Sequence, residues 1–172
     1  TLESAPLSST LESIGQSAFA GCSALKGVEL PDGLTAIANS TFSGCTSLEE
    51  MEIPDSVTSI EANAFAGCTG MTRLIVPDSV TSWASAAFQN CTGLTEIYIP
   101  DNVTEIGEGA FMRCSSLTSV FIPASVTTIG PFSTDVFLEC PSIAEISVAE
   151  DNPKYDSREN CNAIIETASN KL

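Results

Sequence analysis

The sequence contains no histidine among its 172 residues. Histidine is the usual base beside a catalytic serine or cysteine and a frequent zinc ligand, so its absence excludes Ser-His-Asp and Cys-His pairs and every His-ligated metal site. Glycine-rich phosphate-binding motifs are missing too, since Gly107-Glu108-Gly109 is followed by Met112 where a third glycine belongs. Paired carboxylates could hydrolyse glycosides, but 22 acidic residues produce such pairs by chance. We therefore expect that the protein is not an enzyme and that it binds neither a metal nor a cofactor.

Basic residues and long apolar runs are also scarce. Six lysines and arginines stand against 22 aspartates and glutamates, for a formal net charge of −16. Nucleic acids and anionic membrane surfaces attract basic proteins, so this balance disfavours both as partners. The sequence has no apolar run long enough to span a bilayer and no secretory signal pattern at its start. Because residues 1–7 already fit the repeat described next, we expect a mature form or a piece of a longer protein.

What the sequence does contain is a repeat of 23 residues. Phenylalanine recurs at this spacing from Phe19 to Phe111, and once more after 26 residues at Phe137. A cysteine follows each of these phenylalanines after three residues, and columns of leucine, isoleucine, valine and proline keep the same period. One unit of this length cannot enclose a core, so its apolar side chains are buried only when neighbouring units stack on it. The period therefore predicts a solenoid.

Each repeat contains one segment typical of a strand and one typical of a tight turn. The strand pattern is L-x-x-I-x-I-P, in which β-branched residues alternate and a proline ends the strand. Stacked copies should form a parallel sheet. The segment x-x-A-F-x-x-C suits a single helical turn, and the glycine before the cysteine, as at Gly21, suits a left-handed exit, although Arg113 and Glu139 stand there in later repeats. The candidate N-caps of that turn are Ser17, Ser40, Asn63 and Ser85.

These motifs resemble the BspA-like leucine-rich repeats of bacterial cell-surface proteins, whose pattern is I-P-x-S-V-T-x-I-G-x-x-A-F-x-x-C-x-x-L-x-x-I. The segment from Ile99 to Cys114 matches this pattern nearly residue for residue, and the resemblance extends from about Leu2 to Val148. It implies a fold of the α/β class, a right-handed β/α solenoid with short parallel strands and little helix. It also implies a protein that is secreted or held on a bacterial surface and that binds other macromolecules.

Two segments depart from the regular repeat. Three extra residues enter between Ile129 and Phe137, within residues 130–135, and should bulge into solvent because the neighbouring strands then stay in register. After Val148 the sequence becomes polar and rich in turn-forming residues. We therefore divide the chain into six solenoid repeats over residues 1–148 and a variant terminal repeat or cap over residues 149–172. In the latter, Ile164 and Ile165 are expected to cover the last turn.

Seven cysteines would ordinarily suggest disulfide bonds. Six of them occupy one column, so their side chains should point the same way from successive turns, whereas a disulfide needs two Cβ atoms that face each other. The column predicts a ladder of buried free thiols that act as small apolar spacers. Cys161 lies outside the column and could be a free thiol.

Aspartate follows the proline in four repeats, and two interpretations compete. Hard cations are bound by several oxygen ligands, so the column could form a cation-binding stripe. Aspartate also suits the Pro-Asp turn that closes each strand, which is the interpretation we prefer. The four residues are Asp32, Asp55, Asp78 and Asp101.

The outward side of the predicted strands is the strongest candidate for a binding site. Side chains alternate between the two faces of a strand, so Ile75, Tyr98 and Phe121 should form a row of large apolar side chains in solvent. Exposed aromatic clusters with a polar rim are typical of partner sites. Tyrosine and phenylalanine also favour strands for their own sake, so both interpretations stay open. The candidate contact residues are Glu50, Glu52, Arg73, Ile75, Glu96, Tyr98, Ser119 and Phe121.

The resemblance and this face together predict a non-catalytic adhesion module that binds a protein of the host, for example of the extracellular matrix, or of a neighbouring cell. A structural spacer within a larger surface protein is the alternative, and such a spacer would tolerate substitutions on the strand face. A third interpretation is a glycan-binding module that uses the exposed aromatic rings for stacking, in which case free sugars should protect Tyr98.

Overall fold

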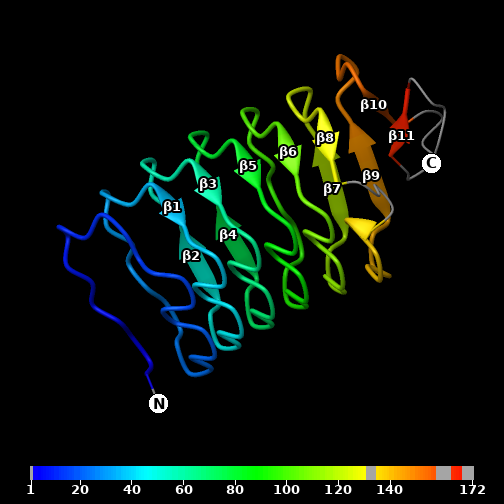
Figure 1. The fold of residues 1–172 in the computed structure, drawn as a ribbon. Helices are drawn as coiled ribbons and strands as arrows, with labels where there is room; N and C mark the ends of the chain where they lie inside the picture. The colour runs from blue at the N-terminus through cyan, green and yellow to red at the C-terminus, as the bar shows by residue number, and fades with distance from the viewer. Residues whose placement is uncertain (1, 131–134, 158–163, 168–172) are drawn as a thin grey trace.

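The computed structural model describes residues 2–130, 135–157 and 164–167. The chain winds into coils that lie side by side in sequence order, with the first coil at one end and β11 near the other (Figure 1). The described residues form short strands and turns and contain no α-helix. The predicted solenoid of short parallel strands with little helix is therefore confirmed.

The strands predicted before the proline are present in several coils. β2 pairs with β4, and β7 with β9, in parallel and at matching positions of successive repeats. Single bridges from Ser4 to Gly27 and from Glu96 to Ser119 continue this alignment in other coils. The bounds are Glu50–Glu52 for β2, Arg73–Ile75 for β4, Ser119–Ile122 for β7 and Glu145–Val148 for β9.

A second parallel sheet, which the sequence analysis did not predict, follows the Pro-Asp turn. It has five strands in the order β1-β3-β5-β6-β8. Each is only two residues long, too short for the alternation by which a strand is recognised in a sequence. Main-chain hydrogen bonds between coils hold it together, such as that from Thr81 N to Thr58 O at 3.0 Å. The strands are Ala36–Ile37 (β1), Ser59–Ile60 (β3), Ser82–Trp83 (β5), Glu105–Ile106 (β6) and Thr128–Ile129 (β8).

The single helical turn predicted around each phenylalanine is wrong. Within this corner of the coil the amides alternate between two kinds of acceptor. Ala20 N donates to Ser17 O of its own coil at 3.0 Å, whereas Phe19 N donates to Thr41 O of the next coil at 2.9 Å. A helical turn would keep both bonds within the coil. The corner is therefore a third region in which neighbouring coils are hydrogen-bonded to each other.

A left-handed backbone at two positions makes this alternation possible. The predicted exit before the cysteine has φ between 59° and 74° even where Asn90, Arg113 and Glu139 replace glycine. The residues predicted as N-caps are left-handed instead at Ser17, Ser40 and Asn63, and the series continues at Ala86, so Ser85 is not part of it. Such a backbone costs an L-residue about 1–2 kcal/mol. The hydrogen bonds between coils thus override the local preference.

The core is a column of aromatic rings that runs through the coils. Adjacent phenylalanine rings are stacked, with centroids 5.3 to 5.8 Å apart and interplanar angles from 0° to 12°. Trp83 packs edge-on against Phe88 and Phe111 at 5.3 and 5.6 Å. Offset stacks and edge-to-face pairs are the arrangements that aromatic rings prefer. The stacked residues are Phe19, Phe42, Phe65, Phe88, Phe111 and Phe137.

The six cysteines of the repeat form the predicted ladder of free thiols. Each thiol from the second onward donates to the carbonyl oxygen of the phenylalanine one coil earlier, as Cys68 Sγ does to Phe42 O at 3.1 Å. Burial, followed by the charge of the neighbouring thiol, raises the pKa of Cys45 to about 11 and the pKa values of Cys68 and Cys114 to about 12. Burial therefore disfavours the thiolate, which is the nucleophilic form of cysteine. Cys161 lies outside the described residues.

The raised thiol pKa values predict a loss of stability in alkali. An unfolded cysteine ionises near pH 9, whereas folded Cys68 ionises near pH 12. The stability that this difference contributes is complete below the unfolded pKa and is lost as the pH rises through the folded one. The Cys68 thiol should thus cost about 1.4 kcal/mol per pH unit within that window. Urea unfolding at several pH values should show this slope, and Cys68→Ala should reduce it. Equal slopes for both proteins would contradict the prediction.

The segment after β9 packs against the last regular coil through Asn152. The Asn152 side-chain Nδ2 donates to Pro123 O at 2.8 Å and to Val126 O at 3.0 Å, and its Oδ1 accepts from Lys154 N and Tyr155 N at 2.9 and 2.8 Å. Tyr155–Asp156 (β10) and Ile165–Glu166 (β11) form an antiparallel pair, and Ile164 is buried. We propose that this segment caps the solenoid. The predicted bulge at 130–135 lies almost wholly outside the described residues.

Candidate functional site

The side chains that point outward from the strands before the proline form the surface that we call the strand face. All eight candidate contact residues lie on it and are exposed. The parallel register places Glu50 beside Arg73 and Glu52 beside Ile75, and the bridge from Glu96 to Ser119 aligns the later coils in the same way. The structure thus brings these residues together, and their role in binding stays a prediction.

Three large apolar side chains stand exposed on consecutive coils of the strand face. Ile75 is 42% exposed, Tyr98 59% and Phe121 51%. Among the described residues the other large exposed apolar side chains, Leu2 and Leu138, lie outside this row. We call Ile75, Tyr98 and Phe121 the apolar row.

The hydroxyl group of Tyr98 gives the apolar row a polar end. Partial desolvation, followed by the negative charges of Asp101 and Asp78, raises the pKa of the Tyr98 phenol. A phenol is protonated at neutral pH even at its ordinary pKa, and this shift acts in the same direction. A protonated phenol both donates and accepts hydrogen bonds, so Tyr98 can combine apolar contact with a polar one.

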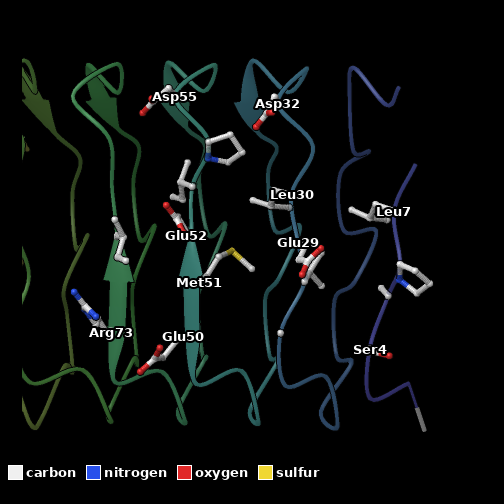
Figure 2. A pocket seen from close by; sticks show the side chains of 17 residues that line it. Ser4, Leu7, Glu29, Leu30, Asp32, Glu50, Met51, Glu52, Asp55 and Arg73 are labelled. Carbon is white, nitrogen blue, oxygen red and sulfur yellow. The ribbon is translucent and has the colours of Figure 1, made fainter. Parts of the chain in front are cut away.

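The part of the strand face that precedes Tyr98 is hollowed (Figure 2). This acidic hollow has a volume of about 1020 Å³ and is lined by four successive coils, from Ser4 to Ile75. The half-buried Leu7 and Leu30 contribute apolar surface, and Arg73 is its basic residue. Its carboxylates are those of Glu29, Asp32, Glu50, Glu52 and Asp55.

The acidic hollow joins two features that the sequence analysis treated separately. Asp32 and Asp55 were considered only as members of the column after the proline, and Glu29 was not among the candidate contact residues. The predicted Pro-Asp turn is formed, since Val57 N donates to Pro54 O at 3.0 Å. In Figure 2 this turn lies directly beyond the strand that carries Glu52. The two-residue spacing between Glu52 and Pro54 is the signal that could have assigned the turn to the same site.

The charge of the hollow determines which ligands it can attract. Five carboxylates against one guanidinium produce a negative potential, which draws in cationic groups. Among residues 2–130, 135–157 and 164–167, no three histidine, cysteine, aspartate or glutamate side chains come together as a metal site. The same part of the chain contains no helix that could cross a membrane.

The coils, the inter-coil ladders and the exposed strand face define a leucine-rich-repeat solenoid. The family model of the BspA type leucine rich repeat region matches six copies of its repeat, over residues 1–55 and 35–164. The chain therefore belongs to the BspA-type leucine-rich-repeat family. None of the curated proteins is significantly similar to it in sequence.

Several solved structures are similar to this chain. A leucine-rich repeat protein of T. pallidum is 33% identical with a TM-score of 0.68, and the match covers 71% of this chain and 58% of that one. A leucine-rich repeat protein of Bacteroides ovatus is 28% identical with a TM-score of 0.78, and the match covers 86% of this chain and 37% of that one. A leucine rich cell surface protein of Faecalibacterium prausnitzii is 31% identical with a TM-score of 0.65, and the match covers 92% of this chain and 47% of that one. The chain thus spans 37% to 58% of the length of these relatives.

Proposed function

We propose that this chain is a non-catalytic module of a bacterial surface or secreted protein, and that it binds a protein of the host or of a neighbouring cell through the strand face. The observation that carries the proposal is the apolar row on three consecutive coils. Family membership and the similarity to a cell surface protein of Faecalibacterium prausnitzii support the location.

The apolar row supports a binding role over that of a spacer. A spacer needs only the inward columns and the main-chain hydrogen bonds between coils, because these hold the coils together. Its outward positions can all be polar, as they are at Glu29 and Glu52 in the earlier coils. At the same position Tyr98 and Phe121 leave half or more of their surface in water. Clustered exposed apolar side chains usually mark a surface that a partner covers.

The double variant Tyr98→Ser/Phe121→Ser tests this proposal. We expect it to unfold like the wild type, because both side chains are exposed, and to bind at least about 100-fold more weakly, since aromatic anchors carry most of the energy of an interface. Binding would be measured on immobilised extracellular-matrix proteins and on cultured host cells. Leu138→Ser is the control, because it removes an apolar side chain that is 44% exposed and lies outside the row.

Each other outcome would support a different role for the chain or for the apolar row. Unchanged adhesion of the double variant would identify a spacer. Competition by free sugars, together with protection of Tyr98, would identify a glycan-binding module. Loss of folding would show that the row belongs to the core, which its exposure contradicts.

A further inference from the structure

We infer that the partner presents an extended, cationic polypeptide segment, which lies across the strands with its basic side chains over the acidic hollow and its apolar side chains over the apolar row. This inference rests on the proposed function and adds the chemistry and the orientation of the ligand. It follows from the position, the spacing and the charge of groups on the strand face.

The hollow and the row form one continuous track. Glu29, Glu52, Ile75, Tyr98 and Phe121 occupy the same place in five successive repeats, and the register confirms the alignment of Glu52 with Ile75. Neighbouring strands lie about 4.8 Å apart, so the track is about 19 Å long. An extended chain advances about 3.3 Å per residue, and a segment of about six to eight residues therefore covers it.

The side chains along this track change in character from one end to the other. Acidic side chains occupy the first two places, at Glu29 and Glu52, and apolar ones the last three. Arg73 lies next to Ile75 at the boundary and lines the hollow on that side. A cationic side chain over Arg73 would be repelled, so the basic residues of the ligand belong on the Glu29 side of it. The track thus determines which coils the basic and the apolar parts of the ligand lie over, as well as the charge of the ligand.

Charge complementarity is the reason for choosing a cationic segment. The two ion pairs found among the described residues, Arg113 with Glu139 and Lys154 with Glu166, leave the carboxylates of the hollow out. Those carboxylates give the hollow a negative potential, which a cationic ligand would neutralise. Complementary charges at an interface mainly determine which partner binds and how fast. A neutral ligand would contact the apolar row but leave the hollow uncompensated.

Selection from a phage-displayed library of random octapeptides on the immobilised chain tests the inference. We expect the selected peptides to carry lysine or arginine at one end and aliphatic or aromatic residues at the other. Synthetic copies should bind more weakly as salt rises from about 50 to about 300 mM. Reversing two charges of the hollow, in Glu29→Lys/Glu52→Lys, should weaken them at least about 10-fold.

The matched control makes the same change of charge on the other side of the coil. Glu12→Lys/Glu105→Lys replaces two exposed carboxylates outside the strand face, Glu105 in β6 of the second sheet and Glu12 one coil before the position of Thr35. It should leave peptide affinity unchanged. An equal loss in this control would overturn the inference, because it would show a response to net charge alone. Circular dichroism would verify that both variants fold.

The composition of the selected peptides separates this inference from the proposed function. Neutral or acidic peptides whose binding disappears in Tyr98→Ser/Phe121→Ser would overturn the cationic ligand and leave the strand face as a binding site. Peptides whose binding survives every strand-face variant would overturn both. Basic and apolar peptides that depend on both the hollow and the row would support the inference.

Discussion

Phe88→Ala should lower the free energy of unfolding by about 3–5 kcal/mol, the range that is usual for removing a buried aromatic side chain. Phe88 is fully buried, and its ring stacks on Phe65 at 5.8 Å and on Phe111 at 5.3 Å. The Trp83 ring packs against it at an interplanar angle of 79°, with the two ring centroids 5.3 Å apart. The cavity cannot close easily, because the main chain is fixed to the next coil by the bond from Phe88 N to Ala110 O at 2.9 Å. The measured loss in the free energy of unfolding should therefore include the full cost of the cavity.

Phe19→Ala is the control for this effect. Phe19 is only partly buried, and among the described rings it stacks on Phe42 alone, at 5.4 Å. In a solenoid each repeat is stabilised by its neighbours, so the loss of a terminal ring should cost clearly less than that of a central one. Urea unfolding followed by circular dichroism would measure both losses. Equal losses would contradict a column of rings stabilised by contacts with both neighbours.

Asn152→Ala should destabilise the end of the solenoid by about 2–4 kcal/mol. The side chain is 8% exposed, and it satisfies two main-chain carbonyls of the preceding coil and two amides of its own turn. A buried polar group left without its partner costs about 1–3 kcal/mol. Alanine would remove this donor from the carbonyl of Val126, would leave the carbonyl of Pro123 with the Val126 amide at 3.3 Å, and would release the turn that places Tyr155.

Hydrogen exchange would locate this loss, because the amides of Tyr155 and Ile129 should lose protection first. Ile129 N donates to the Tyr155 hydroxyl at 3.1 Å and depends on the same turn. Asn102→Ala is the matched control, since Asn102 Nδ2 also donates to a carbonyl of the preceding coil, Asp78 O at 2.8 Å, but at an exposed site. It should cost less than about 1 kcal/mol. Unchanged protection in Asn152→Ala would contradict the proposed cap.

The candidate site could be predicted in part from the sequence. Strand alternation alone places Tyr98 and Phe121 outside, since each lies between two residues of the buried columns. The hollow could not be predicted, because its shape depends on how coils two and three repeats apart are placed in space. Ser4 and Ile75 line the same hollow although they belong to coils three repeats apart. The sequence therefore indicated the strand face, and the structure added the acidic hollow within it.

The sequence by itself determined which side chains repeat and which of them are buried, because a fixed period forces equivalent residues of successive coils to lie over one another. This accounts for the phenylalanine column, for the thiol ladder and for the exposure of Tyr98. Only the tertiary structure decided which carbonyl oxygens accept hydrogen bonds from the main-chain amides. Ser17 adopts φ of 58° and Phe19 N bonds to the next coil, because the neighbouring coil offers an acceptor that no local pattern can predict. The second sheet arises for the same reason, since a strand of two residues is stable only when another coil lies beside it.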